Sequence, residues 1–127
     1  MANGYTVTIK ESTLELTARE RIILKDTTNA IKLDNVVEEG KNLVITPTAY
    51  AVLAVHNENS VDKDYEQYLI IGSDGTKYVT GSSSFIDAFV NIWSEMRAET
   101  DDAFDITVYK VPSKNRPGKY FLSCSLI

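Results

Sequence analysis

Apolar and polar residues alternate in several short stretches of the chain, and this alternation predicts a mainly β protein. The segment "YTVTI" at 5–9 alternates apolar residues with threonine, as a half-buried strand does. The stretch 41–59 is rich in β-branched and apolar residues, and Pro47 divides it because proline cannot donate a hydrogen bond to a ladder. We therefore expect strands at 43–46 and at about 50–56.

The clearest local signal is a hairpin around Asp74 and Gly75. Two apolar stretches, 65–72 and 76–80, flank this pair. An Asp-Gly pair supplies the positive φ angles of a tight turn between antiparallel strands. The sequence therefore predicts a β-hairpin here.

One long amphipathic helix is predicted directly after this hairpin, at about 83–98. Its apolar residues recur at helical spacing and form one face, which consists of Phe85, Ala88, Phe89, Ile92 and Met96, flanked by Trp93. The serines at 82–84 offer an N-cap. We expect the aromatic side chains of this helix to pack in the core rather than to stack on bases.

A shorter helix is predicted at 18–25. Thr17 and Glu20 stand three positions apart, which is the spacing of a capping box at a helix N-terminus. We expect Ile22 and Ile23 to face the core. A strand over part of the same segment is the alternative.

The chain closes with a second predicted hairpin, in which a turn-rich loop joins two strands. In the first strand, 104–111, Ile106 and Val108 face one way. Alternate residues of the last strand share one face, and these are Tyr120, Leu122, Cys124 and Leu126. We expect Val108 and the last three of these side chains to be buried.

The order and length of these elements predict the fold class. Short strands with one long helix in 127 residues are typical of a mainly β, α+β domain. We expect a single domain over 1–127, an OB-fold-like small Greek-key barrel capped by the helix at about 83–98, with an α+β roll as the alternative. Hydrophobic residues make up 43% of the chain, which is enough for a core.

The composition limits the chemistry that the chain can perform. Cys124 is the single cysteine, so no internal disulfide can form, and a reducing compartment fits best. A pair of His56 with Cys124 is arithmetically possible, but a packed thiol is the simpler interpretation. The chain has no phosphate-binding glycine loop or nucleophile elbow, and neither a signal peptide nor a membrane-spanning run is evident. We therefore expect an intracellular protein that is not an enzyme and has no catalytic residue, cofactor or metal.

The charge is separated along the chain, although the net charge is -5. Residues 95–105 carry a charge of -4, because five carboxylates face one arginine, whereas residues 106–127 carry +4. The basic residues of the second segment are Lys110, Lys114, Arg116 and Lys119, and Tyr109, Tyr120 and Phe121 lie among them. Basic side chains contact phosphates and aromatic faces stack on bases, so this pattern suits single-stranded nucleic acid. A solvated, non-binding loop has the same composition.

The second half of the chain resembles small single-stranded-DNA-binding proteins of protein-primed Bacillus phages. The resemblance covers about 74–127 and rests on "DGTKY", the amphipathic helix, "FDITVYK", "SK", "GKYF" and the final "SLI" in this order. The positions that match are Asp74, Gly75, Tyr78, Lys114, Gly118 and Phe121. The chain departs from the pattern at residues 115–117 and at Cys124. The resemblance implies an OB-like barrel that protects displaced single strands during phage DNA replication.

The resulting hypothesis is sequence-nonspecific binding of single-stranded DNA in the cytoplasm of a phage host. Phosphate contacts are expected from Lys77, Lys110, Lys114, Arg116 and Lys119. Bases would stack on Tyr109, Tyr120 or Phe121, with Tyr78 at the rim. The protein would be a monomer or a small homo-oligomer and would also contact phage replication proteins.

Two other classes of function remain open. A protein-interaction module would use the acidic run 95–105 to bind a host or replication protein. A virion structural subunit is the third possibility, and it would form stable oligomers.

Overall fold

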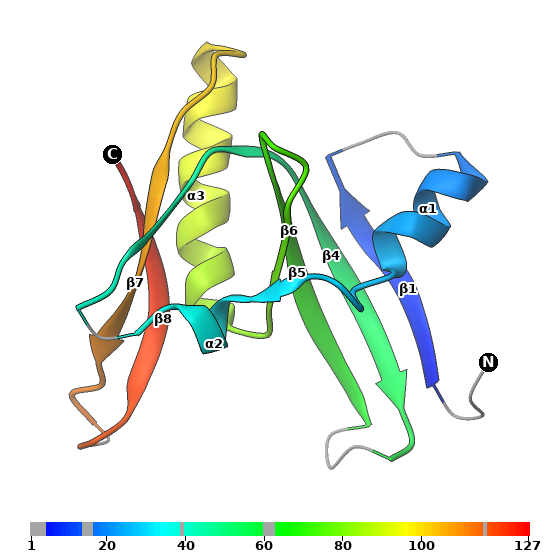
Figure 1. Cartoon of the computed structure of the whole chain (residues 1–127), viewed down its shortest axis with the longest axis horizontal. Helices are drawn as coiled ribbons and strands as arrows, with labels where there is room; N and C mark the ends of the chain where they lie inside the picture. Colours follow the sequence, from blue (N-terminus) through cyan, green and yellow to red (C-terminus); the bar gives the residue numbers. More distant parts are fainter. Residues whose placement is uncertain (1–4, 14–16, 39, 60–62, 116) are drawn as a thin grey trace.

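Two β-sheets and one long helix form most of the described chain (Figure 1). The computed structural model describes residues 5–13, 17–38, 40–59, 63–115 and 117–127. The larger sheet contains, in spatial order, β1 (Tyr5–Ser12), β4 (Pro47–Asn57), β5 (Asp64–Gly72), β6 (Lys77–Thr80) and β2 (Ile31–Lys32). The smaller sheet contains β3 (Leu43–Ile45), β7 (Ile106–Pro112) and β8 (Tyr120–Leu126). The prediction of a mainly β protein with helices is confirmed.

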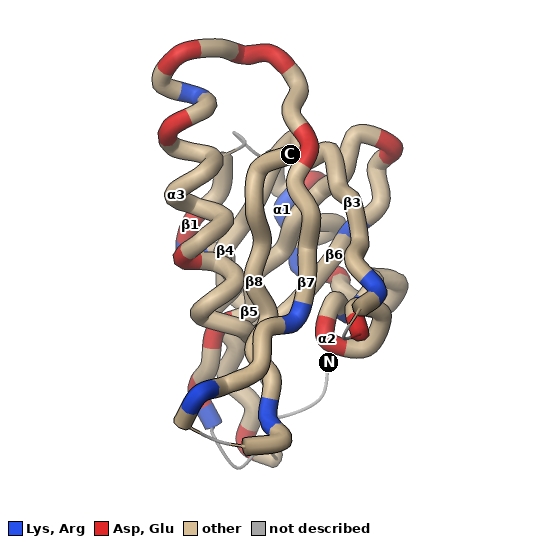
Figure 2. Tube along the Cα trace, turned by 90° about the vertical axis from the view of Figure 1, so that its left-hand side faces the viewer, with Lys and Arg blue, Asp and Glu red and all other residues tan. Residues whose placement is uncertain are grey.

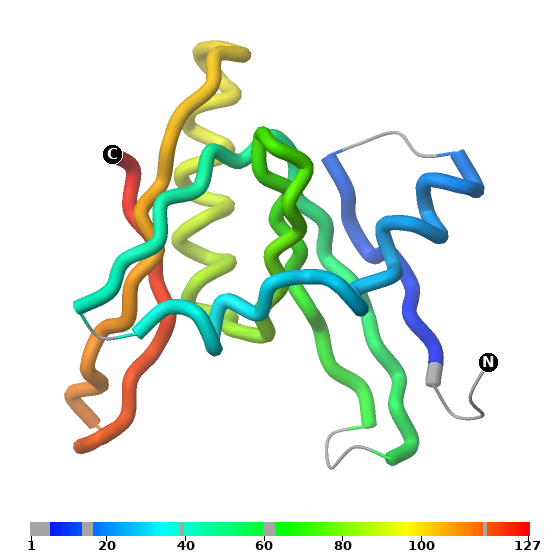
Figure 3. Tube along the Cα trace, viewed as in Figure 1, coloured from blue at the N-terminus to red at the C-terminus, as the bar shows by residue number. Residues whose placement is uncertain are grey.

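One bent segment of chain belongs to both sheets. β3 and β4 are separated only by Thr46, and the chain turns there from the smaller sheet into the larger one (Figure 3). Pro47 begins β4, and the register shifts between Pro47 and Ala49, as expected where proline interrupts a ladder. The Thr46 hydroxyl donates to the Asp105 carboxylate, and the Thr46 carbonyl accepts from the Ser73 backbone nitrogen at 2.8 Å. These bonds fix the bend between the sheets.

Helix α3 (Ser83–Glu99) fills the space between the two sheets with its apolar face. Phe85 and Phe89 are fully buried, and the Phe89 ring meets Tyr50 of β4 edge-on, with a centroid distance of 5.4 Å. The Ser82 side chain accepts a hydrogen bond from the Phe85 backbone nitrogen, which caps the helix as the sequence predicts. The predicted helix and its core-packing role are therefore confirmed.

The hairpin between β5 and β6 is confirmed, but its turn differs from the predicted one. Within this turn, Gly75 has a positive φ, of 85°, whereas Asp74 does not. The Gly75 nitrogen donates to the Gly72 carbonyl and the Gly72 nitrogen donates to Thr76, each at 2.9 Å. This is the pattern of a three-residue loop that ends in a left-handed glycine. The Asp74 carboxylate instead accepts from the Thr76 nitrogen at 3.0 Å.

Helix α1 (Ala18–Lys25) packs on the opposite face of the larger sheet. The predicted capping box is present, because Thr17 and Glu20 exchange side chain–backbone hydrogen bonds of 3.2 Å in both directions. The strand alternative is therefore wrong. The prediction that Ile22 and Ile23 face the core is also wrong, since they are 67% and 54% exposed, whereas Leu24 is buried. A helix of eight residues turns only a narrow stripe toward the sheet, and Leu24 occupies it.

The C-terminal hairpin follows the predicted alternation, although its ends are less buried than predicted. Val108, Leu122 and Cys124 are buried, as expected. Leu126 is 47% exposed, so its predicted burial is wrong. Alternation determines the face on which a side chain lies. Leu126 lies on the inner face, but it is the last residue of β8, where the core no longer covers this face.

Substitutions in α1 test which of its side chains stabilises the fold. Leu24→Ala is expected to lower the free energy of unfolding by about 2–3 kcal/mol, because it removes a buried side chain from the sheet. Ile22→Ala on the same helix is the matched control, and its effect should stay within about 0.5 kcal/mol. Urea unfolding measures both. Equal losses for the two variants would show that α1 packs by a different face.

Candidate nucleic-acid interface

The smaller sheet has one face toward the core and one toward solvent. The register pairs Val44 with Thr107, Thr107 with Ser125, Tyr109 with Ser123, and Val111 with Phe121, which places all of these on the solvent side. We call these residues the outer face: Val44, Thr107, Tyr109, Val111, Phe121, Ser123 and Ser125. Val44 is 55% exposed and Phe121 is 42% exposed. Large apolar side chains on an uncovered sheet indicate a binding surface.

Two aromatic side chains of the outer face are diagonal neighbours. Tyr109 lies opposite Ser123, and Phe121 is two residues before Ser123 on β8. Diagonal positions on one face are close enough for aromatic side chains to form a shared surface. The Tyr109 hydroxyl is 2.6 Å from the Ser125 hydroxyl, which orients its ring along the sheet. The structure therefore brings together two of the predicted stacking residues.

The tip of the β7–β8 hairpin carries exposed cations. The Ser113 nitrogen donates to the Lys119 carbonyl at 2.9 Å, and Gly118 turns the chain with a φ of 81°. Lys114 and Lys119 are exposed on this tip, and Tyr120 is 45% exposed beside them. Arg116 lies outside the described residues. We call Lys114 and Lys119 the basic end of the outer face.

The opposite end of the same sheet is acidic. The exposed carboxylates there, which we call the acidic end, are Glu95, Glu99, Asp101, Asp102 and Asp105. The Ile127 nitrogen donates to the Asp105 carbonyl, so this end adjoins the end of β8 that is farthest from the hairpin tip. Figure 2 shows the separation, with acidic positions around the α3–β7 connection and basic positions along the hairpin.

Arg97 is the one arginine within the acidic segment, and the protein itself holds it. Its guanidinium donates to the carbonyls of Thr100 and Asp102, each at 3.0 Å. It also lies 4.7 Å from the centroid of the Trp93 ring. Arg97 therefore braces the connection after α3.

Two of the predicted phosphate-binding lysines instead bind backbone carbonyls. The Lys77 ammonium donates to Ile23 at 2.6 Å and to Asp26 at 3.2 Å, at the C-terminus of α1, where a cation is favourable. The Lys110 ammonium donates to the Asp34 carbonyl at 3.0 Å, in α2 (Leu33–Val36). Both ammonium groups therefore make contacts within the fold.

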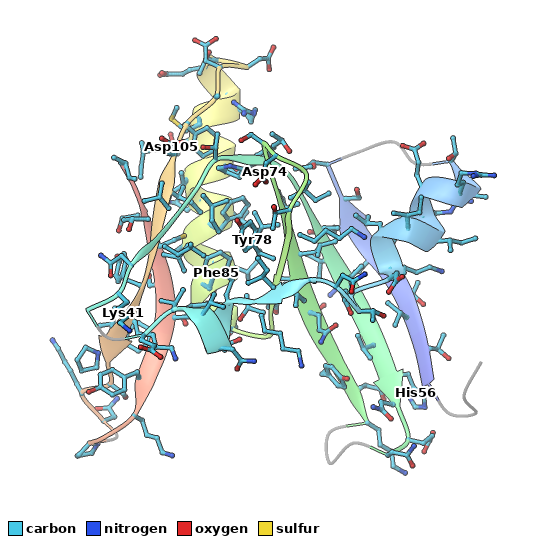
Figure 4. The ribbon with its side chains drawn as sticks, viewed as in Figure 1. Lys41, His56, Asp74, Tyr78, Phe85 and Asp105 are labelled. Carbon is cyan, nitrogen blue, oxygen red and sulfur yellow. The ribbon has the colours of Figure 1, made fainter. Side chains whose placement is uncertain are left out.

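Tyr78, the predicted rim residue, lies against the core. Its side chain is partly buried against the cluster that contains Phe85, and it points into the space between the sheets (Figure 4). The alternation along β6 could have indicated this. Alternation along β3 and β7 could likewise have indicated Val44 and Val111, which are not among the predicted site residues and which the register places on the outer face.

His56 and Cys124 do not form a pair. The two ring nitrogens of His56 lie 2.7 Å from Asp64 and 2.6 Å from Glu58, near the end of the larger sheet (Figure 4). Cys124 is buried in the smaller sheet, its thiol contacts the Phe85 carbonyl at 4.0 Å, and burial raises its pKa to about 12. The thiol is therefore protonated and shielded, as expected for a packed cysteine.

The described residues contain no group of three or more His, Cys, Asp or Glu side chains placed to hold a metal ion. Within the same residues, no helix combines the length and the apolar content that a membrane span requires.

Comparison of the chain with known protein families, with curated proteins and with solved structures finds no match. The geometry of the outer face therefore carries the functional argument.

The structural role of Lys77 can be tested by substitution. Lys77→Met keeps the aliphatic stem but removes the hydrogen bonds to α1, so the free energy of unfolding should fall by about 1–2 kcal/mol in urea. Lys32→Met, at an exposed position of β2, is the matched control and should change little. If Lys77→Met instead leaves stability unchanged and weakens binding of an oligonucleotide, Lys77 is a DNA contact as the sequence predicts.

His56 should make the stability dependent on pH. Hydrogen bonds from the His56 ring to the carboxylate of Asp64 first, and then to that of Glu58, raise the pKa of His56 above its ordinary value of 6.5. A raised pKa in the folded state adds stability below pH 6.5, and this stability is lost as the pH rises through the folded-state pKa. Nuclear magnetic resonance titration should show that Asp64→Asn lowers the pKa of His56.

Unfolding of His56→Gln provides the second readout. Its stability deficit relative to the unsubstituted protein should be larger at about pH 5.5 than at about pH 9. A deficit that is equal at both values would mean that the two carboxylates do not favour the charged imidazole.

Proposed function

We propose that this protein binds single-stranded DNA without sequence preference through its outer face and basic end. The observation that carries the proposal is the placement of exposed Phe121, diagonal to Tyr109, beside the exposed Lys114 and Lys119. Aromatic faces stack on any base, and lysines contact phosphates by releasing counterions, so neither interaction requires a particular sequence. Arg116 would add a further cation to the same loop.

The connectivity supports the proposal of an OB-like Greek-key barrel. The bent segment β3–β4 acts as a shared first strand, because it pairs with β5 in the larger sheet and with β7 in the smaller one. Helix α3 then lies between the third and fourth strands of the succession β4, β5, β6, β7, β8. A partly open five-stranded Greek-key barrel of this kind is typical of OB-folds that bind oligonucleotides.

Helix α2 would link the two sheets of this barrel, because it contacts β6 in one sheet and β7 in the other. The Asp34 carboxylate accepts from Thr80 of β6 at 2.8 Å, and the Asp34 carbonyl accepts from Lys110 of β7 at 3.0 Å. Leu33 of the same helix is fully buried in the core between the sheets. This bridge would hold the smaller sheet in a fixed position and so keep its outer face in shape for binding.

The proposed place in phage DNA replication rests on the resemblance over 74–127 and on the nonspecific chemistry of the site. A protein that covers displaced strands of any sequence needs stacking and phosphate contacts rather than base-edge readout. The acidic end supports a directional arrangement, because it repels DNA from the opposite end of the sheet. A cytoplasmic location in the host belongs to the same proposal.

Fluorescence anisotropy with a labelled oligo-dT tests this proposal. Phe121→Ala is expected to weaken binding by about 1–3 kcal/mol, because it removes one stacking surface. The double variant Lys114→Glu/Lys119→Glu should reduce affinity at low salt and also flatten the dependence of affinity on salt concentration, since fewer counterions are released.

A matched control is available on α1, far from the outer face. Arg19→Glu/Lys25→Glu makes the same change in net charge, and its two effects on the helix dipole have opposite signs. This variant should bind almost as well as the unsubstituted protein. Equal weakening by both double variants would mean that net charge, and not the basic end, controls binding. The absence of binding at low salt would refute the proposed function.

The acidic end favours a second candidate function, binding of a host or replication protein. Its carboxylates are exposed on one connection, and the nearby arginine is held by backbone carbonyls and Trp93. The Lys114→Glu/Lys119→Glu variant separates the two candidates, because it should impair DNA binding while it leaves binding of a basic partner intact.

A further inference from the structure

The outer face leaves apolar surface uncovered in the described part of the chain. Val44 and Phe121 lie on this face and are 55% and 42% exposed, respectively. Tyr109 and Val111 of β7 lie on the same face and are partly exposed. Four large apolar or aromatic side chains on one small sheet are more than isolated surface residues, and such a patch marks an interaction surface.

The charge pattern selects the partner and its orientation. The basic end adjoins the beginning of β8, and the acidic end adjoins its last residue, since Ile127 binds the Asp105 carbonyl. Two copies whose outer faces meet with antiparallel strands therefore place each basic end against an acidic end. With parallel strands, the like charges would meet and repel. Only the antiparallel arrangement is complementary, and it satisfies both pairs of ends at once.

We propose that the outer face binds a second copy of this chain, in a two-fold dimer with antiparallel strands. Such an interface is isologous, so a single self-complementary patch is sufficient. In the dimer, Lys114 and Lys119 of each copy face the carboxylates that include Asp101 and Asp102 of the other copy. The apolar side chains Val44 and Phe121 pack between the two sheets.

The contact is made face to face rather than strand to strand. Helix α3 packs along β8, and the Ser84 hydroxyl donates to the Leu122 carbonyl at 2.7 Å. The side of β8 that is not paired with β7 is therefore already in use at its centre. Addition of a β8 strand from another copy to that edge would break this contact, whereas the outer face requires no rearrangement.

The dimer goes beyond the proposed DNA binding and uses some of the same residues. The acidic end of the second copy would occupy the place that phosphates take at Lys114 and Lys119. DNA and the second copy therefore compete, and the dimer is the state of the protein without DNA. Self-association is measured without any oligonucleotide. A protein that does not dimerise can still bind DNA, and a protein that does not bind DNA can still dimerise, so the two proposals fail separately.

Sedimentation velocity of the full chain at low salt tests the dimer. The unsubstituted protein should dimerise at concentrations below about 1 mM, as a small interface with charge complementarity implies, and added salt should weaken the dimer. Lys114→Glu/Lys119→Glu and Asp101→Lys/Asp102→Lys should each weaken self-association by at least about tenfold, because each places like charges together.

Mixing the two variants gives the decisive result. The reversed basic end of one variant is complementary to the reversed acidic end of the other, so an equimolar mixture should form a heterodimer. All the substituted positions are exposed, and circular dichroism confirms that each variant is folded. The proposal is overturned if the unsubstituted protein stays monomeric up to about 1 mM. It is also overturned if either variant dimerises normally or if the mixture stays monomeric.

Discussion

The apolar face of α3 is the contact on which the rest of the structure depends. Phe85 and Phe89 are fully buried between the two sheets, and their rings continue into Trp93 with centroid distances of 6.0 and 5.9 Å. The smaller sheet has three strands, and the apolar side chains on its inner side must be covered by another element. Packing on α3 supplies this burial for its inner side, and the bend at Thr46 links it to the larger sheet.

This arrangement covers the two sheets unequally. The larger sheet is packed on both sides, by α3 on one and by Leu24 of α1 on the other. The smaller sheet is packed on its inner side only, so Val44 and Phe121 remain exposed in the described structure. The outer face is thus a direct consequence of where the covering elements lie. It has the aromatic and apolar character that both DNA and a second copy of the chain would require.

The four lysines that the sequence predicts as phosphate contacts divide into two groups that differ in their hydrogen-bond partners. Lys77 and Lys110 have backbone carbonyls within reach and stabilise α1 and α2, whereas Lys114 and Lys119 lie on an exposed hairpin tip. A carbonyl at the end of a helix competes with water for an ammonium group. The ammonium group binds the carbonyl when the fold holds the two groups close together. The same residue type therefore serves the fold in one place and carries free charge in the other.

The sequence by itself determined the elements whose signals are local. It determined the capping box at Thr17, the hairpin at Gly75, the helix that begins after Ser82 and the separation of charge along the final third, because neighbouring residues are sufficient to set each of these. Alternation within each strand also placed Tyr109 and Phe121 away from the predicted core residues Val108 and Leu122, so the two aromatic side chains could share the opposite face.

Only the tertiary structure decided which surfaces are covered. Ile22 and Leu24 have similar side chains, yet the position of the sheet buries the second and exposes the first. Lys77 reaches α1 across a separation of 54 residues, and Lys110 reaches α2 across 76. Contacts over such separations depend on how the elements pack, and no local pattern records them. The chain thus specified its strands and helices locally, and their packing decided which charges and apolar side chains remained available for binding.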